Sequence, residues 1–107
     1  MSDNGPLRLV GSCRVDFTGA SEAAFNANSG AFETVRANNS EVALTPPAAG
    51  RQVQPGDVFI VTPEGTVFGQ CVVLRAFANF ISIRNFDAAG VEQEEDFSVA
   101  WYSVVRG

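Results

Sequence analysis

The stretch FSVAWYSVVR, residues 97–106, decides the fold class of this 107-residue chain. It is rich in β-branched and aromatic residues, which favour a β-strand, and successive side chains of a strand point to opposite faces of its sheet. The faces carry Phe97, Val99, Trp101, Ser103 and Val105 on one side and Ser98, Ala100, Tyr102, Val104 and Arg106 on the other. A strand that is apolar on both faces lies in the centre of its sheet or is covered by a neighbouring subunit, and the sequence leaves both possibilities open.

Upstream of this stretch, short apolar segments alternate with turn residues at intervals of about 8–12 residues, which is typical of a sandwich or barrel. The expected strands cover residues 7–17, 31–37, 41–45, 57–62, 67–78, 80–86 and 97–106. We therefore predict an all-β fold, a single antiparallel β-sandwich or jelly-roll-like barrel of about seven or eight short strands. This domain spans residues 7–107, and residues 1–6 form a flexible N-terminal arm ahead of it.

Three short segments predict local features of this fold. Gly11, inside the first expected strand, indicates a β-bulge or a close approach of another part of the backbone. Residues 21–25 predict a single helical turn, which residues 26–30 end in a loop. Pro55-Gly56 predicts the centre of a type II turn, which needs a residue with positive φ at its third position.

The net charge of −5 argues against non-specific nucleic-acid binding, which needs basic patches to replace the counterions of phosphates. All seven cationic residues are arginine, a residue that suits subunit interfaces because it forms bidentate pairs and is weakly hydrated. A GC-rich genome, in which arginine codons are favoured, is the alternative explanation. Residues 1–6 do not resemble a signal peptide, and no stretch approaches the roughly 20 apolar residues of a membrane span, so we expect no membrane partner.

The chain contains no histidine, which removes serine–histidine and cysteine–histidine catalysis together with the commonest metal ligand. No glycine-rich phosphate loop is present, since residues 65–69 have the wrong spacing and no lysine. Cys13 and Cys71 are too few for a zinc site of the usual four-ligand kind. We expect two buried free thiols, with a disulfide as the alternative, and we predict no catalytic, metal or cofactor site and no enzymatic activity.

The densest acidic cluster consists of Glu92, Glu94, Glu95 and Asp96. It follows a turn and has no aromatic residues around it, so we predict an exposed, solvated loop. Weak calcium binding through carboxylate oxygens is the alternative, although the spacing matches no calcium loop.

Four further side chains each have two interpretations. Asp57 follows the Pro-Gly turn, and we predict that its carboxylate accepts backbone N–H bonds there rather than acting in catalysis. Trp101 is predicted as a core anchor, with a platform for a ligand as the alternative. Arg75 and Arg84 lie in expected strands, where they either form cross-strand ion pairs or reach across a subunit interface.

The run from Val53 to Gly107 resembles the small β-sandwich proteins of tailed-bacteriophage virions. The matching pieces are Pro55-Gly56-Asp57, Val58-Phe59-Ile60-Val61-Thr62-Pro63, Gly69, Asn79-Phe80-Ile81-Ser82-Ile83-Arg84-Asn85 and Trp101-Tyr102-Ser103-Val104-Val105. The resemblance implies a jelly-roll-like sandwich that forms trimers and serves as a stoichiometric virion component without enzymatic activity. The matching residues are turn and core residues, so no binding site is carried over.

We expect a capsid decoration (cement) protein, a homotrimer that binds the major capsid protein and stabilises the shell. Its place is the capsid surface of the virion, which is assembled in the host cytoplasm. The subunit or capsid interface residues that we predict are Arg8, Arg14, Arg75, Arg84, Tyr102 and Arg106. The alternative is a fibre or tail module that binds a receptor or carbohydrate, for which the candidates are Phe25, Asn26, Asn28, Asn38 and Asn39.

Overall fold

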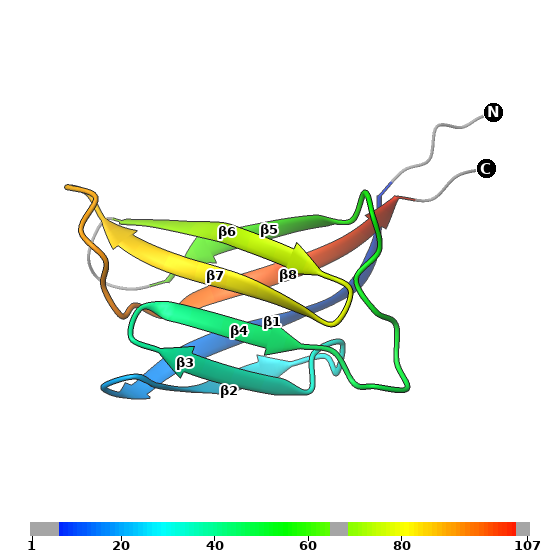
Figure 1. Ribbon diagram of the computed structural model, residues 1–107, viewed down its shortest axis with the longest axis horizontal. Coiled ribbons are helices and arrows are strands. Elements are labelled where there is room, and N and C mark those ends of the chain that lie inside the picture. The colour runs from blue at the N-terminus through cyan, green and yellow to red at the C-terminus, as the bar shows by residue number, and fades with distance from the viewer. Residues whose placement is uncertain (1–6, 65–68, 105–107) are drawn as a thin grey trace.

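Two antiparallel sheets packed together form the part of the chain that the computed structural model describes, residues 7–64 and 69–104. The strands are β1 (Leu7–Gly19), β2 (Glu22–Asn28), β3 (Thr34–Asn38), β4 (Glu41–Thr45), β5 (Val58–Pro63), β6 (Gly69–Phe77), β7 (Phe80–Asp87) and β8 (Phe97–Val104). Sheet A has the order β2-β1-β8-β5 and sheet B the order β3-β4-β7-β6 (Figure 1). The all-β prediction is confirmed, and the sheets form a sandwich. No helix that could cross a membrane occurs in residues 7–64 and 69–104.

The fold-deciding stretch forms β8, which lies in the middle of sheet A between β1 and β5. Its residue Trp101 is opposite Gly11 of β1 and opposite Phe59 of β5. Of the two possibilities that the sequence left open, the central position is therefore the one that the structure shows. The predicted residues Val105 and Arg106 of this strand lie outside the described residues, as do the arm at residues 1–6 and positions 67–68.

The core between the sheets is filled by alternate residues of the inner strands. The largest fully buried side chains are Trp101, Phe32, Phe97, Leu44, Ile81 and Ile83. Burial of each such side chain contributes roughly 1.5–3 kcal/mol, so the core is the main source of stability.

The hairpin of β1 and β2 differs from the sequence prediction. Residues 22–28 form β2, so the helical turn predicted at residues 21–25 is wrong, and the loop predicted at residues 26–30 starts too early. This segment pairs antiparallel with β1, and its residues Ala23 and Phe25 pack against the core. Pairing and burial outweigh the weak local preference for a helical turn.

The type II turn predicted at Pro55-Gly56 is confirmed. The Asp57 N–H donates a hydrogen bond of 3.1 Å to the Gln54 carbonyl, and Gly56 has a φ of 89°. A residue with a side chain is strained at this φ, which explains the glycine. The turn brings the Asp57 carboxylate next to Trp101, which is fully buried.

Trp101 is held by packing and by a polar anchor. Phe32 and Phe59 stack on its ring with centroid distances of 5.1 and 5.7 Å. Its indole Nε1–H donates a hydrogen bond of 2.9 Å to Asp57 Oδ2. A buried indole N–H without a partner destabilises a protein, so this bond allows the ring to occupy the core. The prediction of Trp101 as a core anchor is confirmed.

Asp57 is itself held by three groups. Besides the Trp101 indole, the Gln54 N–H donates a hydrogen bond of 2.9 Å to Asp57 Oδ2, and Arg51 Nη2 donates one of 2.9 Å to Oδ1. The side chain is only 3 % exposed, so these bonds replace the hydration that the carboxylate loses. The prediction of a turn carboxylate that accepts backbone N–H bonds is confirmed.

We predict that Asp57→Ala lowers the free energy of unfolding by about 1–3 kcal/mol, because the Trp101 N–H is then buried without an acceptor. Urea denaturation of Asp57→Ala, Trp101→Phe and the double variant isolates this bond from the packing change. The loss in free energy of unfolding in the double variant should be smaller than the sum of the two single losses, since either substitution removes the bond. Strict additivity would show that the bond contributes nothing.

Both features predicted for Gly11 are present. The pairing of β1 with β8 shifts register between Leu9 and Gly11, which is a bulge. A Cβ atom at Gly11 would lie 2.4 Å from Ala31 Cβ and 2.5 Å from Ser29 Oγ. The segment between β2 and β3 therefore crosses β1 at a point where only glycine leaves enough space.

We predict that Gly11→Ala lowers the free energy of unfolding by about 1–3 kcal/mol, because the new methyl group displaces Ala31. Gly19→Ala is the matched control in the same strand, where a Cβ meets only the flexible Glu22 carboxylate at 3.2 Å. This control should change stability by less than about 0.5 kcal/mol in urea denaturation. Equal effects of the two substitutions would contradict the close approach.

Candidate interaction surface

The structure does not bring the predicted interface residues together. Arg8 and Arg75 are both exposed, but Arg8 lies on β1 of sheet A and Arg75 on β6 of sheet B. Tyr102 lies on β8, and Arg106 is outside the described residues. These residues lie on both sheets, and their role at a subunit or capsid interface stays a prediction.

Arg14 is engaged within the chain. Its Nε lies 3.0 Å from Asp16 Oδ1 and its Nη1 lies 2.9 Å from Glu64 Oε1. The hydrogen bond to Asp16 raises the pKa of Arg14 further above its ordinary value. The group is more than a third exposed, so the pair adds little to stability.

Arg84 forms the cross-strand ion pair that was one of its two predicted roles. Glu41 of β4 is opposite Arg84 of β7, and Arg84 Nη2 lies 2.8 Å from Glu41 Oε1. Glu41 also accepts a hydrogen bond from the Ser82 hydroxyl. This bond, followed by the interaction with Arg84, lowers the pKa of Glu41. Sheet B thus carries a polar network around these three residues, and Arg84 Nε lies 3.2 Å from Glu92 Oε1 beside it.

The outer side of sheet A is different, because apolar side chains cover it. Val99 and Trp101 point into the core, so Ala100 and Tyr102 on the same strand point outward. The register places Leu9 and Val58 on either side of Tyr102, Leu7 beside Val104 and Ile60 beside Ala100. We call this group the apolar face; its members are Leu7, Leu9, Val58, Ile60, Ala100, Tyr102 and Val104.

The apolar face is open to solvent in the described part of the chain. Leu9, Ile60, Leu7 and Val104 are 54, 51, 47 and 40 % exposed, respectively. None of the seven side chains carries a charge. Contiguous exposed apolar patches of a few hundred Å² commonly mark sites where proteins bind one another. The apolar face is therefore the candidate interaction surface of this chain.

Of the apolar face, sequence reasoning named only Tyr102 as an interface residue. The alternation of residues 97–106 already indicated a second apolar side of β8. Leu9 and Ile60 could not be added, because the neighbours of β8 in the sheet are set by tertiary pairing. The guanidinium groups of Arg14 and Arg84, two of the predicted interface residues, form ion pairs within the chain.

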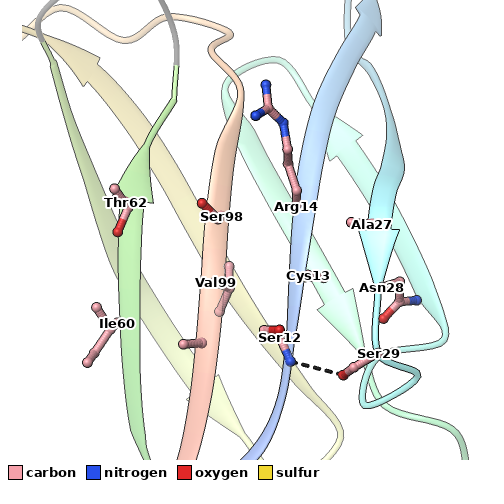
Figure 2. A pocket seen from close by; sticks show the side chains of 11 residues that line it. Ser12, Cys13, Arg14, Ala27, Asn28, Ser29, Ile60, Thr62, Ser98 and Val99 are labelled. Carbon is pink, nitrogen blue, oxygen red and sulfur yellow. Dashed lines mark hydrogen bonds between the residues drawn. The ribbon is translucent and has the colours of Figure 1, made fainter.

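A shallow depression adjoins the apolar face and crosses all four strands of sheet A (Figure 2). Its volume is about 420 Å³, and its floor is made largely by small side chains such as Ser12, Ala27 and Ser98. Ile60 stands at one side of it, and the Ser12 N–H donates a hydrogen bond of 3.0 Å to Ser29 Oγ at the other. Arg14, already paired, is the one charged residue among those that line the depression.

The acidic cluster is less exposed than predicted, because its carboxylates bind neighbouring strands. Asp96 Oδ1 accepts the Phe17 N–H at 2.8 Å, and Glu94 Oε2 accepts the Ser21 N–H at 2.9 Å. Both Asp96 and Glu94 are half-buried, so the prediction of an exposed loop is wrong for them. In residues 7–64 and 69–104, no three cysteine or carboxylate side chains are grouped to hold a metal ion.

The same cluster fastens the two sheets at one end of the sandwich. Glu92 Oε1 accepts the Ser40 hydroxyl at 2.8 Å on the β3–β4 turn, whereas Glu94 binds Ser21 on the β1–β2 turn. Ser21 and Asn39 both have positive φ, and the Asn39 N–H donates to Ser21 Oγ at 3.1 Å. These contacts give the acidic residues a structural role.

Three of the residues predicted for carbohydrate binding, Phe25, Asn26 and Asn28, make contacts within the chain, whereas Asn38 is exposed on β3. Asn28 Nδ2 donates to the Phe32 carbonyl at 2.8 Å, and Asn26 Nδ2 donates to Asp16 Oδ2 at 2.6 Å. Phe25 packs against the core. Amides with these partners fix the β1–β2 hairpin and do not converge on a common cavity.

The two cysteines are free, so the disulfide alternative is wrong. Cys13 is buried on β1 of sheet A, and burial raises its pKa from 9.0 to about 12. Cys71 on β6 of sheet B is only partly buried, and its Sγ–H donates to Asn85 Oδ1 at 2.8 Å. Burial, followed by the nearby charge of Glu95, raises the pKa of Cys71 to about 11. Neither thiol is set up as a nucleophile.

Comparisons of the chain with protein-family models, with curated proteins and with solved structures give no match. The function of the surface therefore has to be argued from its own geometry.

We predict that both thiols react slowly with a disulfide reagent at pH 8 in the native protein. A rise in pKa of two units lowers the thiolate fraction about 100-fold, so Cys71 should react about 100-fold more slowly than in urea, and Cys13 more slowly still. Each of the variants Cys13→Ala and Cys71→Ala retains one thiol. Stopped-flow kinetics of the two variants therefore assign each phase of the reaction to one cysteine. Native rates equal to the unfolded rates would contradict the burial of the thiols.

Proposed function

We propose that this chain is a non-enzymatic assembly protein that docks its apolar face onto another protein. The observation that carries the proposal is the apolar face itself, seven uncharged side chains on three adjacent strands. Removing apolar surface from water contributes roughly 25 cal/mol per Å², so a complementary partner gains affinity by covering it. Tyrosine, present in the face as Tyr102, is enriched in such contacts.

The partner that we propose is the major capsid protein of a tailed bacteriophage. The chain would then be a capsid decoration protein, bound to the surface of the virion and stabilising the shell. This step rests on the resemblance of residues 53–107 to small virion proteins. The resemblance and the apolar face concern the same strands, β5 and β8, and for that reason we join them in one proposal.

The alternative, a fibre or tail module that binds a receptor or carbohydrate, has less support. A sugar site needs polar groups and aromatic rings that converge on one cavity. The amides of Asn26 and Asn28 are already bonded within the β1–β2 hairpin and its loop. A glycan array probed with the purified protein tests this alternative, and specific hits would favour it over docking.

We predict that Leu9→Lys weakens binding to capsid shells at least tenfold, since the new ammonium group would be desolvated within the docked face. The measurement is co-sedimentation of the purified protein with expanded shells of a tailed-bacteriophage major capsid protein. Leu9 is 54 % exposed, so the substitution should leave the fold intact.

Thr34→Lys is the matched control for this experiment. Thr34 is an exposed residue of β3 in sheet B, and its substitution changes the net charge by the same amount. The control should bind shells as the unmodified chain does. If Leu9→Lys binds equally well, the apolar face is not the docking surface; if the unmodified chain does not bind shells, the capsid partner is wrong.

A further inference from the structure

The two sheets together have four edge strands, β2 and β5 in sheet A and β3 and β6 in sheet B. In Figure 1, β5 and β6 lie along one side of the sandwich and β2 and β3 along the other. An edge strand presents unpaired backbone N–H and C=O groups, and the ligand that satisfies such a row is another β-strand. Natural proteins normally block their edges with bulges or charged side chains.

Three of the four edges are blocked in this way. In β2, the register with β1 shifts so that Asn26 is an extra residue, and in β6 the register with β7 shifts so that Leu74 is extra. Such bulges twist an edge away from a straight partner. β3 is only five residues long and carries Arg36 at its centre.

The β5 edge has neither protection. Val58–Pro63 pairs with β8 residue by residue without a register shift. Its sequence, VFIVTP, contains no charged residue, and only the terminal Pro63 interrupts the supply of N–H donors. In the described part of the chain, no strand pairs with its outer side. Ile60 at its middle is 51 % exposed.

We infer that a second copy of this chain pairs with β5 along this edge, antiparallel and about a two-fold axis through Ile60. Two identical strands related by a two-fold axis run antiparallel, so the contact is self-complementary and closes as a dimer. Ile60 of one copy then lies opposite Ile60 of the other, and Val58 lies opposite Thr62. The two copies of sheet A become one continuous eight-stranded sheet.

Charge favours a second copy at the β5 edge over one at the β3 edge. Each copy carries a net charge of −5, so copies repel one another except where a contact is uncharged. Self-pairing of β3 about its centre would place Arg36 against Arg36, whereas self-pairing of β5 places only neutral side chains together.

This inference does not rest on the capsid partner, since it concerns the edge of sheet A and not its outer side. It replaces the homotrimer implied by the resemblance with a two-fold dimer. Pairing of β5 leaves Leu7, Leu9 and Val104, on the far side of β8, available for docking. The two copies would present their apolar faces side by side on the same side of the joined sheet.

The experiment is sedimentation equilibrium of the purified full chain over a wide concentration range. The expected result is a monomer–dimer equilibrium, and a species that stays monomeric or forms a trimer would overturn the inference. Ile60→Lys should raise the dimer dissociation constant at least about tenfold, or about 1.4 kcal/mol, because two ammonium groups then face each other. An unchanged dissociation constant would exclude β5 as the contact.

Two controls keep the result specific. Leu9→Lys adds the same charge on the outer side of sheet A but away from the edge, and should leave the dimer intact while it weakens shell binding. Loss of the dimer in Leu9→Lys would overturn the edge assignment. Thermal unfolding shows whether Ile60→Lys folds; if it does not, Thr62→Lys on the same edge takes its place.

A mixture of two variants tests the two-fold register directly. Ile60→Lys and Ile60→Glu should each be weakened as homodimers, yet form a heterodimer when mixed, because opposite charges then lie directly across the strands. Failure of the mixture to dimerise would overturn the pairing of Ile60 with Ile60.

Discussion

The hydrogen bond from the Trp101 indole to Asp57 is the constraint on which much of the sandwich depends. A large ring can occupy the core only if its N–H has a partner, and the partner here is a carboxylate that is itself almost fully buried. The carboxylate in turn requires the Gln54 N–H and Arg51. One buried indole therefore specifies the turn before β5 and the position of β5 beside β8.

The packing around Trp101 extends this constraint to both sheets. Gly11 lies opposite Trp101 in β1, and the absence of a side chain there lets the segment at Ala31 pass close to the strand. Phe32, the next residue, then stacks on the indole ring. The connection from β2 to β3 thus runs over the end of the core, and the bulge at Gly11 is part of the same arrangement.

The inward direction of Trp101 also decides what the outside of sheet A presents. Since side chains of a strand alternate, Tyr102 must point outward, where Leu9 and Val58 meet it. An apolar residue type in the sequence does not show whether the side chain packs in the core or lies on an outer surface that a partner would cover. For this reason the apolar character of residues 97–106 was visible in the sequence, whereas the members of the apolar face on β1 and β5 were not. The acidic cluster shows the reverse case, because its charges suggested solvent and its carboxylates bind the backbone of β1 and the β1–β2 turn.

The sequence by itself determined the all-β class, the turn at Pro55-Gly56, the requirement for glycine at position 11 and the role of Trp101, because each depends on local backbone geometry or on the strand period. It did not determine the strand at residues 22–28, the strand order or the unprotected edge at β5. Those features come from pairing between residues far apart in the chain, and pairing energies are decided by the whole core. Only the tertiary structure could therefore show that Leu9, Ile60 and Tyr102 belong to one surface.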